Sequence, residues 1–394
     1  MPKIVLGVSG GIAAYKSISL ARLLIESGHE VQVVPTPGAL NFVGKATWEA
    51  ITGKPVYANV FEATDQVAHV SIARSADLVV VAPATADLMF RAASGASNDM
   101  LSAVILTTTA PIIYFPAMHT EMWLNQATAA NVKTLRDRGA LVIDPAVGAL
   151  ARGDQGLGRL PEPEQISALI GSFLAKSNMA FDFVGKEVLV TLGGTEESID
   201  PVRVITNRST GEMGASLCRA LYLRGAKVTA VVGNHTATLP HDIEIAQIKS
   251  TTELAAVSQE FATTADIIIM AAAVSDFRVS QSETKIARED NQTLELKPTE
   301  DILTQLVEKR RPNQFIVGFA AQTENPIEHG KEKLIRKKCD LVVANLVGPD
   351  SGFGAVATEV HIISKNGVQS SGKVTKDQAA HLILDEIAKN LTLS

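Results

Sequence analysis

Residues 2–16, PKIVLGVSGGIAAYK, and residues 186–200, KEVLVTLGGTEESID, begin in the same way, and this repeated start indicates the fold. In each stretch an apolar, β-branched run leads into paired glycines, Gly10-Gly11 and Gly193-Gly194. A first strand that ends in glycines is typical of nucleotide-binding α/β domains, because the loop lets a phosphate approach the N–H groups at a helix start. The sequence therefore predicts two such domains on one chain, and their fusion suggests consecutive reaction steps.

Apolar runs alternate with helical patterns through both halves of the chain. The predicted strands of the first half are 3–8, 30–35, 77–82, 111–115 and 141–143, with helical patterns at 12–27 and 122–138. Those of the second half are 187–191, 227–232, 266–270, 314–318 and 340–344, followed by a hairpin that begins with 359–364. Continuous apolar runs of this length are typical of strands buried on both faces of a parallel sheet. The predicted fold class is α/β, with two doubly wound domains at 1–178 and 186–394 and a linker at about 179–185.

Composition narrows the class of protein. The 394 residues are 46% hydrophobic and 20% charged, which fits a globular protein with sizeable cores, and the net charge of −6 argues against a nucleic-acid partner. No apolar run approaches the ~20 residues of a membrane span, and a glycine loop stands where a signal peptide needs an apolar core. The two cysteines, Cys218 and Cys339, form no CxxC motif, so we expect neither a disulfide framework nor a cysteine zinc site. We expect a cytoplasmic protein without a membrane partner.

The loops of the first half favour a ligand site without identifying it. Residues 7–11 do not match GxGxxG, and residues 11–17 do not match a phosphate-binding P-loop, because Tyr15 stands where its second glycine should be; a simple strand-to-helix turn is therefore an equally good interpretation. Thr36 follows the second predicted strand, Pro83-Ala84-Thr85 the third and Pro116-Ala117-Met118 the fourth. In a doubly wound sheet these loops meet at the carboxyl edge, where ligands bind, and small or hydroxylic residues there suit a phosphate and a flat ring.

The motifs GVSGGIAAYK, HVSIARSADLVVVAPATADL, ASNDML and PAMHTEMW together resemble the flavin-dependent cysteine decarboxylase family, over most of residues 2–160. The resemblance implies a flavodoxin-like domain that forms trimers, binds FMN between subunits and uses His69 as its active-site histidine. The FMN contacts that it implies are Ser9, Gly10, Gly11, Ile12, Ala13, Thr36, Pro83, Ala84, Thr85, Asn98 and Asp99. The substrate-binding signature that it implies covers Pro116, Ala117, Met118, His119 and Met122.

The first half departs from this family at two positions. His119 stands where the family has an asparagine thought to hold the substrate carboxylate, and a histidine can still donate a hydrogen bond or supply charge there. Arg152, a candidate substrate contact, lies in a stretch resembling the mobile flap of the family. In the phosphopantothenoylcysteine branch that position is commonly a cysteine thought to help return a proton and hydride to the enethiol intermediate. Either another group finishes the reduction or the first domain is impaired.

In the second half, Ser209-Thr210-Gly211 precedes a helical pattern, and this segment by itself favours simple helix capping over an anion site. DPVRVITNRSTGEMG, AAAVSDF, GFAAQT and KLIRKKCDLVVAN resemble phosphopantothenate–cysteine ligase across about residues 186–390. The resemblance implies that CTP and Mg²⁺ activate 4′-phosphopantothenate as an acyl-cytidylate, which cysteine attacks. It implies catalytic roles for Asn207 and Lys285. It implies nucleotide or substrate contacts at Arg203, Ala272, Ala273, Asp276, Phe319, Lys333 and Lys337. Glu212 and Gln322 replace a lysine and a glutamate common in that family; the metal ligands are not predicted.

The chain as a whole resembles the bifunctional phosphopantothenoylcysteine decarboxylase/phosphopantothenate–cysteine ligase family. The resemblance implies synthesis of 4′-phosphopantetheine from 4′-phosphopantothenate and cysteine, in a homo-oligomer built from decarboxylase trimers and ligase dimers, as in a dodecamer. One alternative is an active ligase whose first domain binds flavin but has lost decarboxylation, and another is a flavin-binding scaffold without turnover. An NAD-dependent oxidoreductase is disfavoured, because no GxGxxG follows either opening strand.

Overall fold

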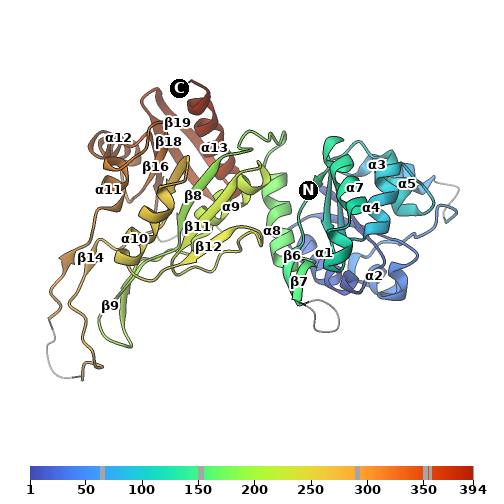
Figure 1. The fold of residues 1–394 in the computed structure, drawn as a ribbon, viewed down its shortest axis with the longest axis horizontal. Helices are drawn as coiled ribbons and strands as arrows, with labels where there is room; N and C mark the ends of the chain where they lie inside the picture. Colours follow the sequence, from blue (N-terminus) through green and yellow to red (C-terminus); the bar gives the residue numbers. More distant parts are fainter. Residues whose placement is uncertain (63–66, 150–154, 289–292, 349–353, 355–356, 394) are drawn as a thin grey trace. The chain divides into compact units, whose positions relative to one another are not determined.

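In a computed structural model of the chain, the described residues are 1–62, 67–149, 155–288, 293–348, 354 and 357–393. They form two compact α/β units, Met1–Ser167 and Ala168–Ser394, and the division falls within helix α8 (Pro163–Leu174) (Figure 1). Both cysteines are buried free thiols of the second unit. In the part of the chain that the structure describes, no helix is both long enough and apolar enough to cross a membrane.

The first unit is built on a parallel five-stranded sheet in the order β2-β1-β3-β4-β5. The strands are β1 (Lys3–Val8), β2 (Glu30–Pro35), β3 (Leu78–Ala84), β4 (Ile112–Pro116) and β5 (Leu141–Val142). This is the flavodoxin-like order, in which the chain changes direction across the sheet between β1 and β3. The α/β prediction for this half is therefore confirmed.

Helices cover both faces of this sheet. On one side, α1 (Lys16–Glu26) contacts α2 (Lys45–Thr52) and β2. Four other helices contribute to the core that contains Val5, Val79 and Val81: α3 (Ala68–Ser75), α4 (Ala86–Ser94), α5 (Met100–Thr107) and α7 (Gln126–Asp137). The helical pattern predicted at 122–138 is broken into α6 (Thr120–Trp123) and α7. Its break is at Asn125, whose side chain accepts a hydrogen bond from the N–H of Ala127 (2.9 Å) and so starts a new helix.

The second unit is built on an eight-stranded sheet in the order β12-β11-β8-β13-β16-β17-β18-β19. The strands are β8 (Glu187–Leu192), β11 (Lys227–Val232), β12 (Glu244–Gln247), β13 (Ile267–Met270), β16 (Phe315–Gln322), β17 (Leu341–Leu346), β18 (Thr358–Ser364) and β19 (Gly367–Val374). The first six are parallel and follow the order of a classical dinucleotide-binding fold, and the last two add an antiparallel hairpin. The chain changes direction between β8 and β13, where such sheets bind ligands.

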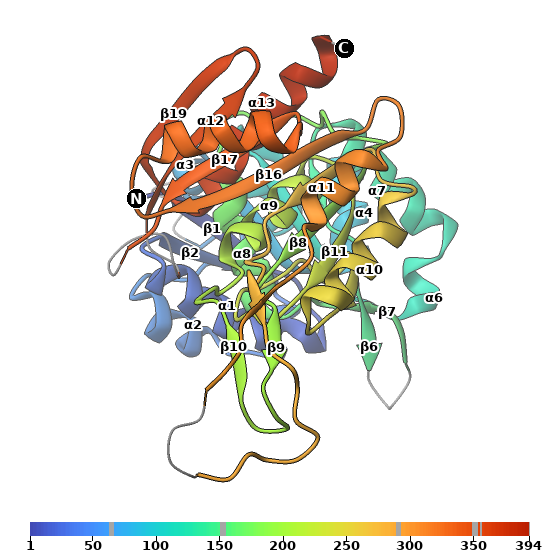
Figure 2. The same ribbon diagram turned by 90° about the vertical axis from the view of Figure 1, so that its left-hand side faces the viewer.

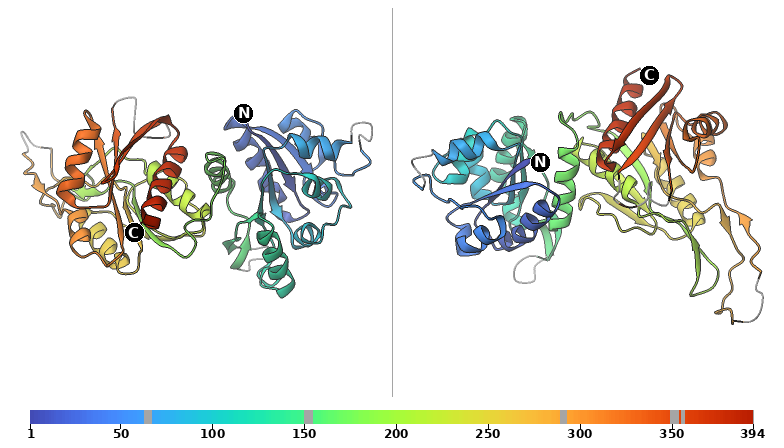
Figure 3. Two further views of the ribbon diagram at one scale, coloured as in Figure 1. Left: turned by 90° about the horizontal axis from the view of Figure 1, so that it is seen from above. Right: turned by 180° about the vertical axis from the view of Figure 1, so that it is seen from behind.

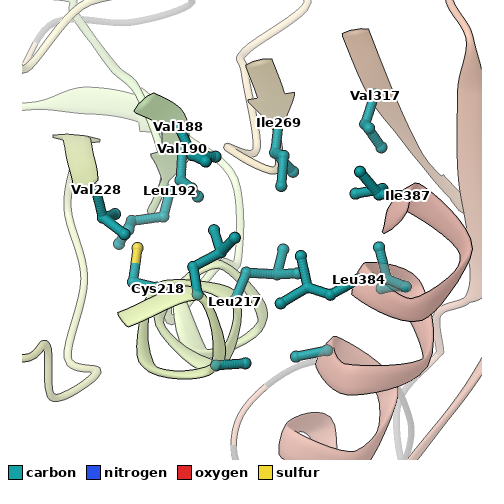
Figure 4. Packing of buried hydrophobic residues seen from close by; sticks show 14 of the residues in the cluster. Val188, Val190, Leu192, Leu217, Cys218, Val228, Ile269, Val317, Leu384 and Ile387 are labelled. Carbon is teal, nitrogen blue, oxygen red and sulfur yellow. The ribbon is translucent and has the colours of Figure 1, made fainter. Parts of the chain in front are cut away.

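Alternate side chains of β8 enter two different cores. On one face, Val188 and Val190 pack with α9 (Glu212–Leu223) and α13 (Lys376–Leu393), which lie side by side (Figure 3). Figure 4 shows Leu217 of α9 and Leu384 of α13 meeting over this face. On the other face, Leu189 packs in the core formed with α10 (Thr251–Ala262), α11 (Ile302–Glu308) and α12 (Pro326–Lys337). Burial on both faces explains why the sequence of β8 is apolar without interruption.

Two ribbons leave the body of the second unit together (Figure 2). One is the hairpin of β9 (Glu196–Ser198) and β10 (Val204–Thr206), and the other contains β14 (Phe277–Arg278) and β15 (Lys297–Pro298). They are tied at Asp200, whose buried carboxylate bonds to the Arg203 side chain and accepts the N–H of Ile286 (3.2 Å). The first unit carries a similar hairpin, formed by β6 (Ala146–Ala149) and β7 (Gln155–Arg159).

Candidate functional sites

A cavity of about 330 Å³ lies at the carboxyl ends of β1, β3 and β4 in the first unit. Its wall is mostly apolar and comes from four loops. The lining residues are Gly10, Gly11, Ile12, Ala13, Tyr15, Lys16, Pro83, Thr85, Ala86, Ala117, Met118, His119, Met122, Gly158, Arg159 and Leu160. Ten of the predicted FMN and substrate residues are among them: Gly10, Gly11, Ile12, Ala13, Pro83, Thr85, Ala117, Met118, His119 and Met122.

The loops around this cavity are held by specific bonds and close contacts. The buried Ser9 hydroxyl donates to the carbonyl of Pro83 (2.7 Å) and accepts the N–H of Thr85 (2.9 Å), so it fastens the loop after β1 to the loop after β3. A Cβ at Gly10 would lie 2.8 Å from the backbone of Gly38, so only glycine allows these two loops to approach so closely. Ser9 therefore shapes the cavity through the backbone around it.

Other predicted residues lie beside this cavity or away from it. Thr36, Ala84 and Pro116 are buried at strand ends and do not line it, and Arg152 lies outside the described residues. Asn98 and Asp99 surround Arg91, whose Nη1 lies 2.8 Å from the Asn98 Oδ1 and 2.6 Å from the Asp99 Oδ2. Asp99 also begins α5 as a capping box with Ser102. Within one chain these two residues have structural roles.

His69 is the second residue of α3 and does not line the cavity. Its ring is half-buried, and its Nδ1 is buried without a hydrogen-bond partner among the described residues. A buried ring nitrogen without a partner is costly, which marks the position as one that a further group could satisfy. The structure of one chain brings His119, but not His69, to the cavity.

A larger cavity of about 830 Å³ lies at the carboxyl ends of β13, β16 and β17 in the second unit, beside the start of α9. The predicted residues that line it are Asn207, Ala272, Ala273, Asp276, Phe319, Lys333 and Lys337. Four of them lie in loops, whereas Phe319 lies in β16 and Lys333 and Lys337 lie on α12. Gly211, with φ +74°, is the residue at the N-terminal cap of α9. Because glycine has no side chain, it cannot accept a hydrogen bond from the first N–H groups of this helix.

Two other predicted residues, Lys285 and Arg203, do not line this cavity. Arg203 is held by Asp200, and its Nη2 also donates to the carbonyl of Ile286 (2.9 Å). Lys285 is exposed and adjoins Ile286, so the two predicted residues lie near one another on the paired ribbons. Their roles in the reaction remain predictions.

Electrostatics on the α12 side of the large cavity depend on two lysines. The Lys333 Nζ donates to the carbonyl of Phe319 (2.5 Å), and its burial, together with the nearby charge of Lys337, lowers its pKa. Lys337 contacts the Asp301 carboxylate. Burial opposes ionisation of Asp301, but its hydrogen bonds with Lys337 and the start of α11 outweigh this effect and lower its pKa. This wall therefore places cationic groups beside one ionised carboxylate.

The sequence analysis did not select several polar residues that line the large cavity. Asp301 precedes α11, and Arg336 lies on α12. Asn345 follows the apolar residues of β17, and the buried Lys376 is the first residue of α13. Asn345 could have been found, because it ends an apolar strand at the carboxyl edge. Lys376 could not, because the β18–β19 hairpin separates it in the sequence from the strands that form the cavity.

The cavity residues of the first unit fit a flavin. Its glycine loop and apolar wall suit a flat aromatic ring, and the helical turn η1 (Ile12–Tyr15) begins at Gly11 without a side-chain cap, as an anion site requires. For a metal, the described ranges contain no group of three or more His, Cys, Asp or Glu side chains arranged as ligands. Asp276 and Asp301 are acidic residues that line the large cavity and could contact a metal ion carried by a nucleotide.

Comparisons with known proteins assign the family. The flavoprotein family model matches residues 1–175, and the model of the DNA/pantothenate metabolism flavoprotein C-terminal domain matches residues 183–391. The coenzyme A biosynthesis bifunctional protein CoaBC of Mycobacterium tuberculosis strain H37Rv is 46% identical over 387 residues, covering 94% of this chain and 92% of that protein. The chain belongs to this family. The CoaBC of Vibrio cholerae is 39% identical over 396 residues, with 99% of this chain and 98% of that protein covered.

Solved structures similar to each half were also found. The C-terminal domain of a CoaBC is 30% identical and covers 55% of this chain and 100% of that domain, with a TM-score of 0.48. The FMN-binding protein AtHal3 is 30% identical and covers 44% of this chain and 96% of its own, with a TM-score of 0.40. The CoaBC relatives extend over both units, so the bifunctional family prediction made from the motifs is confirmed.

Proposed function

We propose that this chain ligates cysteine to 4′-phosphopantothenate and then decarboxylates the product to 4′-phosphopantetheine. The observation that carries the proposal is that each unit of a chain of the CoaBC family has a ligand-sized cavity at the carboxyl edge of its sheet. Because the relatives are named as bifunctional proteins, a ligase with a silent flavin domain is not favoured. The protein is a carboxy-lyase and an acid–amino-acid ligase in one chain.

For ligation, we propose that the large cavity binds CTP with Mg²⁺ together with 4′-phosphopantothenate. A carboxylate is a poor acyl donor, and converting it to a mixed anhydride requires positive charge near the α-phosphate and the departing pyrophosphate. Lys333 and Lys337 supply that charge from α12. Asn207 donates one amide hydrogen to the carbonyl of Val274 (2.9 Å), which orients the side chain and leaves its second hydrogen for the activated carboxyl group. Lys285 would act from the ribbon.

For decarboxylation, we propose that the small cavity holds FMN and the cysteine end of the substrate. When bound, FMN would supply the two-electron oxidation of the thiol, which provides a sink for the electron pair left on the substrate when CO₂ departs, and the reduction that completes the product. Gly10 and Gly11 leave room for a flat ring, and Met118 and Met122 exclude water from it. The exposed His119 lines the cavity and can bond to the substrate carboxylate through either ring nitrogen.

The state of the protein in the cell is also part of the proposal. We propose a homo-oligomer of trimeric first units and dimeric second units, up to a dodecamer, in the cytoplasm. The exposed apolar side chains Phe61, Phe90 and Leu106 of the first unit, and Val202 of the second, provide surfaces for such contacts. Two free thiols suit a reducing compartment.

A one-pot reaction followed by mass spectrometry tests the function. Holoprotein receives 4′-phosphopantothenate, cysteine, CTP and Mg²⁺, and the flavin is identified by its mass. Formation of 4′-phosphopantetheine is expected; 4′-phosphopantothenoylcysteine alone would refute the decarboxylase half, and no amide at all would refute the ligase half. In N207D and K285Q proteins, amide formation should fall, whereas K227Q, at an exposed ion pair with Glu187, is the matched control. Full-rate amide formation by both variants would remove the proposed roles of Asn207 and Lys285.

A further inference from the structure

One group of charged residues at the small cavity has no role in the function proposed above. Lys16 and Arg159 line this cavity, and both bond to the same Glu162 carboxylate oxygen: the Lys16 Nζ lies 3.0 Å and the Arg159 Nη2 2.5 Å from Oε1. Lys16 begins α1, and Arg159 ends β7, so the cluster joins parts of the unit that are far apart in sequence. We call these three residues the Lys16–Glu162–Arg159 cluster.

The charge of this cluster is not balanced within the described part of the cavity. One carboxylate faces two cations, and no Asp or Glu is among the described lining residues. The Lys16 side chain is only 10% exposed, so its ammonium is largely removed from water, whereas the Arg159 side chain is 39% exposed and can reach a ligand. An excess positive charge beside an apolar wall attracts an anionic group strongly, because water screens it poorly there.

The position of the Arg159 side chain is fixed by its surroundings. A Cβ at Gly148 of β6 would lie 3.2 Å from both the Cδ and the Nη1 of Arg159, so the arginine packs directly over this glycine. The carbonyl of the neighbouring Gly158 accepts a hydrogen bond from the N–H of Met118 (2.9 Å), which fastens β7 to the loop that carries His119. Arg159 is therefore held at a defined distance from the substrate signature, rather than left as a mobile surface side chain.

We propose that Lys16 and Arg159, with Glu162 as their positioning residue, bind an anionic oxygen group of the decarboxylase substrate. This inference rests on the proposed decarboxylation. The substrate 4′-phosphopantothenoylcysteine carries two such groups, a phosphate and the carboxylate that leaves as CO₂. An arginine fork suits either of them, because it donates two parallel N–H bonds. Arg159 contacts the anion directly, and the buried Lys16 supplies charge behind it.

The test compares Arg159→Gln with the matched control Arg22→Gln, since Arg22 is an exposed arginine of α1 that does not line the cavity. The holoproteins are assayed with 4′-phosphopantothenoylcysteine and with pantothenoylcysteine, which lacks the phosphate. Loss of a charged hydrogen bond should raise the KM by about ten- to a hundredfold in R159Q and leave it unchanged in R22Q. A rise for the phosphorylated substrate alone identifies the phosphate; an equal rise for both identifies the carboxylate.

Two further measurements separate this inference from the function on which it rests. Titration of 4′-phosphopantetheine, which has the phosphate but no carboxylate, onto the holoprotein measures binding without turnover. Glu162→Gln removes the carboxylate that positions Lys16 and Arg159, so it should raise the KM, but by less than R159Q does. Equal KM and binding constants in R159Q and R22Q would overturn the proposal. So would a changed flavin content or absorption spectrum in R159Q with unchanged KM, because the cluster would then serve the cofactor. A wild-type protein without turnover would refute only the decarboxylation.

Discussion

Replacing Arg224 with methionine should destabilise the second unit more than any change at its surface. The Arg224 side chain is fully buried at the end of α9. Its Nε lies 2.8 Å from Asp182 and its Nη1 2.9 Å from Asp385 of α13, and its guanidinium lies 4.9 Å from the ring centre of Phe183. One side chain therefore fastens the segment before β8 to α9 and α13, whose first residue, Lys376, lines the large cavity.

The size of this effect follows from what the substitution leaves behind. Removing one partner of a buried ion pair costs about 3–5 kcal/mol, because the remaining charge is left without compensation. Asp182 and Asp385 are each about one-third exposed (32% and 33%), so water can rehydrate them, and Asp385 keeps its ion pair with Lys176 (2.8 Å), so the cost lies at the lower end. Methionine fills most of the volume of the arginine stem and limits the cavity. We expect a loss of about 3 kcal/mol in the free energy of unfolding of this unit.

Thiol labelling in urea measures that loss for the second unit alone, because both cysteines of the chain are buried there. Burial raises the pKa of the Cys218 thiol to about 12, so it reacts only after unfolding. The control is Lys227→Met at the exposed pair with Glu187, which should leave the unfolding midpoint almost unchanged, because water screens this pair. If the unfolding midpoints of R224M and K227M shift equally, the buried network does not stabilise the unit and this reasoning is refuted.

Three further outcomes are expected. Leu217→Ala removes a large side chain from the core shown in Figure 4 and should cost about 3–5 kcal/mol by the same labelling; a loss under about 1 kcal/mol would mean that the core collapses around it. Gly214→Ala would bring a Cβ to 2.4 Å from the Leu192 Cβ and should lower the urea midpoint by forcing α9 away from β8, so an unchanged midpoint would contradict this packing. The hydrogen bond from Arg203 holds the pKa of Asp200 below its ordinary value, so its contribution is present at neutral pH and lost on acidification; Asp200→Asn should be less stable at pH 7 and lose less stability towards pH 3, and parallel pH profiles would contradict this.

The strands could be predicted from the sequence because they are continuous apolar runs. The predicted bounds 3–8, 30–35 and 227–232 are those of β1, β2 and β11. Burial on both faces of a parallel sheet produces such runs, so hydropathy alone locates them. The helical pattern at 122–138 was predicted as one helix, and the prediction was wrong at Asn125, because an asparagine cap starts a new helix without interrupting the apolar periodicity.

The cavity residues were predictable to the extent that they directly follow strands. Ala272 and Ala273 lie just beyond the carboxyl end of β13, and Phe319 lies in the carboxyl half of β16, at the edge where a doubly wound sheet gathers its loops. Lys376 could not be predicted, because α13 reaches the cavity only after the β18–β19 hairpin has returned the chain to the sheet. Packing between distant segments decides such placements, and local sequence patterns do not contain it.

The distribution of charge between the two cavities agrees with consecutive reactions on one phosphorylated molecule. The chain carries a net charge of −6, which on average repels anionic substrates. Each cavity nevertheless has lysine or arginine in its wall: Lys333 and Lys337 in the second unit, and Lys16 and Arg159 in the first. An amide formed in one unit and decarboxylated in the other keeps its phosphate throughout, so both units need local positive charge. The small cavity combines that charge with a mostly apolar wall, which suits a step in which a flat cofactor and a departing CO₂ must be kept from water.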